Sequence, residues 1–267
     1  MFKSLKKSTA TFLQNFTNFV NFSNYSRIDT ENAQKINFLK KNGYLDLGTV
    51  LNKDLCKSLS ERISYEINIK NASYIEKTKF HKIDKIDNFV DILEIILNKN
   101  LINLMSSYFR KKIYFSDFDL RRIYPVDYKS IKSQTHSPAD WHKDTRGSQL
   151  KIMVYITNVT SNDNYFSFIP GSHFEHCEDY LNSRYSDESI NNQNEIKWIA
   201  DAGSAMLFDT NIIHRLNRKL ESSIRDSFTF YFTIGQHLHK IIDNKDLIKN
   251  KLLKKLIISN SFISKRY

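Results

Sequence analysis

Three side chains that could share one metal ion are His142, Asp144 and His214. Alternate residues of a β-strand point to the same side, so an imidazole nitrogen at position 142 and a carboxylate oxygen at position 144 could converge. A histidine from a facing strand would complete two nitrogens and one carboxylate with open coordination positions, the ligand set of non-haem iron(II) oxygenases. On residue chemistry alone, a surface His-x-Asp pair and a hydrogen-bonded core histidine stay open as alternatives.

Arg225 and Ser227 form a second pair of polar residues at the spacing of a strand. Ser227, Thr229 and Tyr231 would share one face of that strand, and the three intervening phenylalanines would share the other. Arg225 falls on the polar face, where its guanidinium could hold a carboxylate through two parallel hydrogen bonds and Ser227 could add a third. A solvated arginine ahead of the strand is the simpler alternative.

The elements that would position these residues change character along the chain. Residues 29–112 show mainly helical periodicity, with a helix stop at Asn42-Gly43, a short strand from Tyr44, and a helix cap at Asn52. Beyond residue 113 the apolar period approaches two, which predicts strands. Helices followed by about eight short strands favour a mainly β, α+β domain of the jelly-roll type. The predicted strands include residues 113–115, 150–156, 166–169, 205–208 and 227–234.

Composition bounds the class of protein. The chain has 267 residues, of which 40% are hydrophobic, so one sizeable folded domain is expected and global disorder is excluded. No apolar run is long enough to span a membrane as a helix. The formal net charge is +11, but no nucleic-acid-binding signature accompanies it, so no nucleic-acid partner is expected. Such a charge fits an anionic substrate or an anionic membrane surface.

The two ends of the chain form separate predicted segments around the single folded domain expected at 29–240. Segment 1–28 is basic and aromatic, and segment 241–267 has Leu and Ile at helical spacing among lysines. Either could contact a membrane surface peripherally, or pack on the domain, and the first could be an organellar presequence. Cys56 and Cys177 form no CxxC motif, which favours a reducing compartment. A cytoplasmic location is therefore the expectation, with peripheral membrane contact as one option, and the sequence gives no oligomeric state.

Several ordered motifs resemble the phytanoyl-CoA dioxygenase-like family of Fe(II)/2-oxoglutarate-dependent oxygenases. They are WHKD from Trp141, LKIMVYITNVTSNDN, FSFIPGSH, and the DAGSAMLFD segment before His214. Arg225 follows His214 by the spacing usual for that family's 2-oxoglutarate arginine, and FLKKNGYLDLGTVLNKDLCKSL is similar to its N-terminal helix-strand-helix. The resemblance covers about residues 35 to 235. One departure is Asn164-Tyr165-Phe166, where the family often has Asn-Gly-Pro, in a loop expected near the pocket mouth.

The resemblance implies a double-stranded β-helix, or cupin-like jelly roll, with helices packed outside. It implies that His142, Asp144 and His214 are the iron ligands and catalytic residues, and that Arg225, with Ser227 less securely, anchors 2-oxoglutarate. Asp144 stands where related halogenases have a small residue, so hydroxylation of a C–H bond with release of succinate and CO2 is expected. The substrate would be a small molecule, with charge favouring an anionic or lipid-linked one.

Other readings and other residues stay open. A cupin-like binding protein without turnover, or a metal-dependent isomerase or hydrolase, could use the same fold and ligands. Lys151, Arg121 and Arg122 could contact anions, although a solvent-reaching lysine is an equal alternative for Lys151. His173 belongs to a turn motif, and the rival pair at positions 237 and 239 has no adjacent acidic residue.

Overall fold

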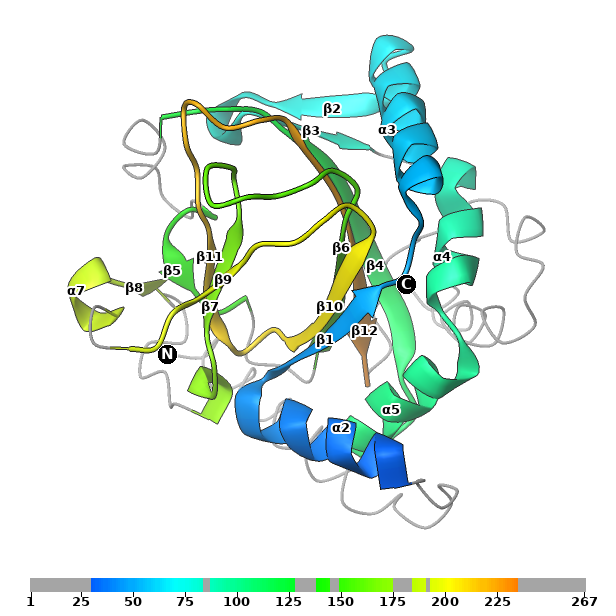
Figure 1. The fold of residues 1–267 in the computed structure, drawn as a ribbon, viewed down its shortest axis with the longest axis vertical. Coiled ribbons are helices and arrows are strands. Elements are labelled where there is room, and N and C mark those ends of the chain that lie inside the picture. The colour runs from blue at the N-terminus through cyan, green and yellow to red at the C-terminus, as the bar shows by residue number, and fades with distance from the viewer. Residues whose placement is uncertain are drawn as a thin grey trace, which may run out of the picture.

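The computed structural model describes residues 30–83, 87–127, 138–144, 149–174, 184–190 and 193–234. In this part of the chain, two antiparallel sheets lie opposite each other, and the longer helices lie outside the larger sheet (Figure 1). No strand pair joins the two sheets among the described residues, so they form no closed barrel. The arrangement is the predicted double-stranded β-helix. The predicted segments 1–28 and 241–267 lie outside the described residues, so the three-part division of the chain stays a prediction.

The larger sheet has the strand order β1-β10-β6-β12-β4-β3-β2. Its centre is β12, which pairs antiparallel with β4 on one side and with β6 on the other. Except for β2, β3 and β4, which follow one another, neighbours in this sheet come from distant parts of the chain, so its register places residues side by side that are far apart in sequence. The bounds are β1 Tyr44–Thr49, β2 Ala72–Ile75, β3 Phe80–Ile83, β4 Tyr114–Ile123, β6 Gln149–Tyr155, β10 Ser204–Asp209 and β12 Arg225–Thr233.

The smaller sheet has the order β8-β5-β11-β7-β9 and carries both histidines of the predicted metal site. Its strands are short, and the pairing between β5 and β11 rests on a single residue pair, His142 with His214. The longer β11–β7 ladder holds β11 in place beside it. The bounds are β5 Trp141–His142, β7 Phe166–Ile169, β8 Arg184–Tyr185, β9 Ile196–Trp198 and β11 Ile213–Leu216.

The helices begin and end where local chemistry predicts. Asn52 accepts a hydrogen bond from the Leu55 N–H at 2.8 Å and so caps α3, as expected. The first helix ends at Asn42, and Gly43 takes the left-handed conformation with φ +78° that favours glycine. The helix bounds are α2 Thr30–Asn42, α3 Lys53–Asn68, α4 Val90–Ile96, α5 Lys99–Phe109 and α7 Asp187–Ile190, with 3-10 turns η2 Glu76–Thr78, η3 Asp87–Phe89 and η4 Ser172–Phe174.

The main core lies between the helices and the outer face of the larger sheet. Figure 1 shows α3, α4 and α5 on the side of that sheet that faces away from the smaller one. Phe228, Phe230 and Phe232 are fully buried there among helix residues such as Leu59 and Met105. Each buried phenylalanine contributes about 1.5–3 kcal/mol of hydrophobic stabilisation, which fixes the register of β12. The opposite side chains of β12 must then point between the sheets, as its alternation predicted.

None of the described helices is long and apolar enough to cross a bilayer.

Candidate metal centre and cosubstrate cavity

His142 and His214 lie directly opposite each other on neighbouring strands of the smaller sheet. Their ring centroids are 4.4 Å apart. The Nδ1 of His142 is 2.7 Å from the Asp140 carbonyl oxygen, and the Nδ1 of His214 is 2.8 Å from that of Ile212. A carbonyl accepts only, so each Nδ1 carries a proton and donates it. With Nδ1 held in this way, the Nε2 of each ring is the nitrogen that can bind a metal.

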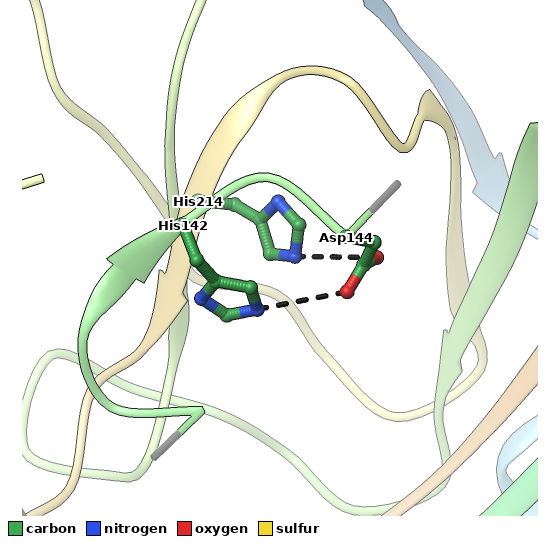
Figure 2. Close-up of side chains that lie close together, drawn as sticks. All are labelled: His142, Asp144 and His214. Carbon is green, nitrogen blue, oxygen red and sulfur yellow. Dashed lines mark ion pairs between the residues drawn. The ribbon is translucent and has the colours of Figure 1, made fainter. Parts of the chain in front are cut away.

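Asp144 completes the group just beyond the end of β5. Its Oδ1 is 3.6 Å from the Nε2 of His142, and its Oδ2 is 3.5 Å from the Nε2 of His214 (Figure 2). The backbone N–H of Asp144 donates to the Thr210 carbonyl at 3.1 Å, which fixes the carboxylate beside β11. One ligand atom from each of the three residues lies within 4.8 Å of the others, close enough for one metal ion.

Two details of the expected geometry were wrong. Asp144 does not lie on the strand with His142, because β5 ends at His142 and the chain turns toward Thr210. His214 does not come from a facing strand but from the strand paired with β5 in the same sheet. Convergence therefore depends on the β5–β11 register and on the Asp144 backbone, and strand alternation alone does not produce it.

The electrostatics of the group suit a divalent cation. Burial and the nearby His214 lower the pKa of His142 to about 4, so its ring stays neutral at physiological pH. Burial would raise the pKa of Asp144, but Lys151 and the two histidines outweigh it and hold that pKa below its usual range. Two imidazole nitrogens, from His142 and His214, and an ionised Asp144 carboxylate, with the remaining directions open to a cavity, fit iron(II).

The cavity beside these residues has a volume of about 160 Å³ and lies between the two sheets. It is predominantly polar on the side of the larger sheet, where β12 contributes four alternating residues. Those four are Arg225, Ser227, Thr229 and Tyr231. The structure thus brings all five predicted site residues, His142, Asp144, His214, Arg225 and Ser227, to one cavity.

Arg225 lies deep in this cavity and keeps hydrogen-bonding capacity. It is 4% exposed, its Nη1 donates to the Asn164 carbonyl at 2.5 Å, and its Nε has no hydrogen-bond partner. Its guanidinium carbon lies 5.0 Å from the ring centroid of Tyr155, which supports it from one face. Asn164 was expected near the pocket mouth, but it is fully buried and orients the arginine. Asn164, the residue of this loop that agrees with the family pattern, is therefore in contact with Arg225.

Lys151 is a cavity residue whose role the sequence left open. It lies on β6, is 8% exposed, and its ammonium group forms an ion pair with Oδ2 of Asp144. Burial alone would lower the pKa of Lys151, but the Asp144 carboxylate outweighs that effect and raises it. The alternative of a lysine that reaches solvent is wrong. Its strand parity with Met153, which also lines the cavity, was the available signal.

The remaining candidates separate clearly. Arg121 lines the cavity and forms an ion pair with Asp119, whereas Arg122 points to the other side of the sheet and binds Asp226. The Nε2 of His173 is 2.9 Å from the Lys40 carbonyl oxygen, in keeping with a turn residue. The pair at positions 237 and 239 lies outside the described residues. Asp119 and Arg218 had no sequence signal that singled them out.

Known structures share this fold at low sequence identity. The non-haem α-ketoglutarate-dependent epimerase SnoN from nogalamycin biosynthesis aligns with a TM-score of 0.61 and 12% identity over 81% of this chain and 88% of that chain. HygX from Streptomyces hygroscopicus, with nickel and 2-oxoglutarate bound, aligns with a TM-score of 0.57 and 12% identity over 83% of this chain and 94% of that chain. EctD from S. alaskensis, with bound Fe, aligns with a TM-score of 0.56 and 13% identity over 79% of this chain and 80% of that chain.

A comparison with curated protein sequences finds no similar chain. The family model for phytanoyl-CoA dioxygenase (PhyH), in contrast, matches residues 39–218. That range contains His142, Asp144 and His214 and includes the strands that present them, β5 and β11. Since the match covers more than half of the 267 residues, the protein belongs to the phytanoyl-CoA dioxygenase family.

Proposed function

We propose that this protein is an Fe(II)- and 2-oxoglutarate-dependent dioxygenase that hydroxylates a C–H bond of a small molecule and releases succinate and CO2. The observation that carries the proposal is that the His142–Asp144–His214 group and the buried guanidinium of Arg225 line one cavity. A metal site and a carboxylate anchor in the same cavity match a cosubstrate with a chelating end and a distal carboxylate.

The proposed roles follow from the geometry. His142 and His214 would bind iron through Nε2, with both rings held by their Nδ1 hydrogen bonds. Asp144 would supply the anionic ligand. Arg225 and Ser227, both nearly fully buried, would bind the distal carboxylate of 2-oxoglutarate. When bound, iron and 2-oxoglutarate supply the activation of dioxygen, and the chain supplies placement and exclusion of water.

Asp144 is part of the argument for hydroxylation. Both of its oxygens lie toward the histidine Nε2 atoms, so with a metal bound its carboxylate would take the position that a halide needs. Relatives in the fold include proteins described as an epimerase and a carbocyclase, so the reaction outcome depends on which substrate atom the cavity places next to the metal.

The substrate is proposed to be anionic or lipid-linked, in keeping with the net charge of +11. Peripheral membrane contact through segments 1–28 and 241–267 stays a prediction, because both segments lie outside the described residues. A cytoplasmic location also stays a prediction. Sedimentation of the full chain with anionic vesicles, compared with a chain ending at Asn244, tests the C-terminal part. Equal partitioning of the two chains would contradict it.

The proposal is tested by loading the full chain anaerobically with ferrous iron and 2-oxoglutarate. We expect the weak visible charge-transfer band of an iron(II)–2-oxoglutarate chelate, and slow succinate release once air is admitted. A D144A/H214A double variant should show neither. Absence of the band in the unmodified chain would reject the oxygenase. A band that survives in the double variant would show that other residues bind the metal.

Succinate release across a panel of candidate substrates would then separate turnover from mere binding. A catalytic hydroxylase releases succinate faster with its substrate present, whereas a cupin-like binding protein does not. A hydrolase or isomerase that uses the same ligands would convert its substrate without dioxygen, so an anaerobic control distinguishes that alternative.

A further inference from the structure

The cavity region holds more positive charge than its own carboxylates balance. Arg121, Lys151 and Arg225 line the cavity, and Arg218 lies close enough for the charges of Arg225 and Arg121 to act on it. The acidic side chains that line the cavity are Asp119 and Asp144, which form ion pairs with Arg121 and Lys151. Arg218 and Arg225 therefore have no acidic partner among the described residues.

Arg218 is the most unusual of these cations. It is 3% exposed, and its Nη2 donates at 2.9 Å to the carbonyl of Tyr124, just beyond the end of β4. Its Nε and Nη1 are buried without a hydrogen-bond partner. Burial, together with the charges of Arg225 and Arg121, lowers its pKa to about 9. A buried cation without a counter-ion is costly, so an anion nearby would stabilise this arrangement.

Arg121 is the cation that can reach a ligand beside the cosubstrate anchor. It lies opposite Ser227 in the β4–β12 ladder, and the next cavity-facing residue of β4, Ile123, lies opposite Arg225. Its guanidinium is stacked 4.5 Å from the ring centroid of Phe80 and forms an ion pair with Asp119, while its Nε is buried without a partner. Its side chain is 30% exposed, more than the buried Arg225.

The proposed cofactors leave this excess of charge in place. A divalent metal and doubly charged 2-oxoglutarate cancel each other. Four cationic side chains still accompany two carboxylates, which leaves two positive charges in a largely buried region. Because Arg225 is proposed to bind 2-oxoglutarate, a further anion in the cavity would have to bind another cation, and Arg121 is the one within reach. The charge of Arg218 offsets that of Asp119, which would otherwise repel such an anion.

We propose that Arg121 binds a carboxylate or phosphate group of the substrate and that the positive charge of Arg218 strengthens this site. The inference rests on the proposed function, because it assigns Arg225 to 2-oxoglutarate. It narrows the substrate to molecules whose oxidised carbon lies within reach of both the metal ligands and an oxyanion held on β4.

The test uses the full chain, loaded anaerobically with ferrous iron and saturating 2-oxoglutarate. Inorganic phosphate and acetate are each titrated by calorimetry, with ethanol as an uncharged probe. The variants are R121Q, R121K and, as a matched control that removes one surface charge, R62Q. Arg62 lies on α3, where it pairs with Asp91, and it does not line the cavity.

We expect the unmodified chain and R62Q to bind one of the two anions with the same affinity. Neither should bind ethanol. R121Q should raise the dissociation constant of that anion by about tenfold or more, because it loses one charge-assisted hydrogen-bonding group. R121K should retain part of the affinity. The anion that binds more tightly, phosphate or acetate, indicates whether the substrate carries a phosphate or a carboxylate group. The charge-transfer band should report an unchanged affinity of R121Q for 2-oxoglutarate.

Several outcomes would overturn the site. These are no anion binding to the loaded chain, equal binding by R121Q, or loss of 2-oxoglutarate affinity in R121Q, which would make Arg121 part of the cosubstrate anchor. If R121Q fails to fold because Asp119 is left unpaired, the double variant D119N/R121Q removes both charges and serves in its place.

The same titration keeps this proposal distinct from the proposed function. If the charge-transfer band never forms, the oxygenase fails, and phosphate is titrated into the metal-free chain. Binding there that depends on Arg121 supports the anion site, and its absence overturns it. If the band forms and no anion binds, the anion site falls while the oxygenase stands.

Discussion

Lys151 forms an ion pair with Asp144 inside the cavity, although one lies on β6 of the larger sheet and the other follows β5 of the smaller sheet. The pair links the two sheets at the candidate metal site. In the metal-free protein, Lys151 provides the positive charge that stabilises the buried carboxylate. A bound metal would supply that charge instead.

The first prediction concerns the variant K151M. Without metal, removal of the ammonium leaves the Asp144 carboxylate without its cation, so we expect a loss of about 2 kcal/mol in the free energy of unfolding. This is below the cost for a fully buried pair, because the Asp144 side chain is 22% exposed. Added manganese(II) should raise the melting temperature of K151M more than that of the unmodified chain, because Lys151 no longer repels the metal.

The exposed Lys197 offers a control, and K197M should match the unmodified chain in both measurements. Equal metal-induced shifts in K151M and the unmodified chain would show that Lys151 and the metal do not compete for Asp144.

The second prediction separates the cosubstrate anchor from the metal ligands. R225Q removes a buried guanidinium whose Nε is free for a ligand, so the dissociation constant of 2-oxoglutarate should rise by about a hundredfold. S227A removes one neutral hydrogen bond and should raise it by only about fivefold. Manganese(II) binding should be unchanged in both variants, and calorimetry measures each affinity. Unchanged 2-oxoglutarate binding in R225Q would remove the anchor from this position.

The third prediction concerns a buried ion pair that supports β4 and β12 from behind. Arg122 donates to both carboxylate oxygens of Asp226 at 2.8 and 2.7 Å, and Ser60 of α3 donates to the same carboxylate at 2.6 Å. Asp226 is fully buried, so D226N should lower the free energy of unfolding by about 3 kcal/mol, because Arg122, whose side chain is only 13% exposed, loses its counter-ion.

The exposed pair between Arg62 and Asp91 provides the comparison. D91N should change the free energy of unfolding in urea by less than about 0.5 kcal/mol, since surface ion pairs contribute little. Similar losses in D226N and D91N would mean that the Arg122–Asp226 pair has no special stabilising role.

The fourth prediction uses two glycines with positive φ. Gly203 has φ +91°, and a Cβ there would lie 2.0 Å from the Leu51 carbonyl oxygen, so the backbone would have to move. Gly48 has φ +69°, and a Cβ added there would have no atom within 4 Å. G203A should therefore cost about 3 kcal/mol or more, against about 1 kcal/mol for G48A. Urea unfolding of both variants measures the difference, and comparable costs would contradict the close approach at Gly203.

The sequence by itself determined the local elements and the residue types of the site. Asn52 as a helix cap, Gly43 after the first helix and the alternation along β12 follow from short-range rules, because capping and strand parity depend only on neighbours in the chain. The alternation was enough to place Arg225 and Ser227 on the polar side of a strand.

Tertiary structure decided which of these residues meet. The single residue pair between β5 and β11 brings His142 to His214, and facing sheets bring Lys151 to Asp144. The close grouping of Arg121 and Arg218 with Arg225 likewise depends on strand register and on a turn after β11. These contacts join positions far apart in sequence and are fixed by the packing of the phenylalanine face of β12, a long-range property that periodicity along the chain does not encode.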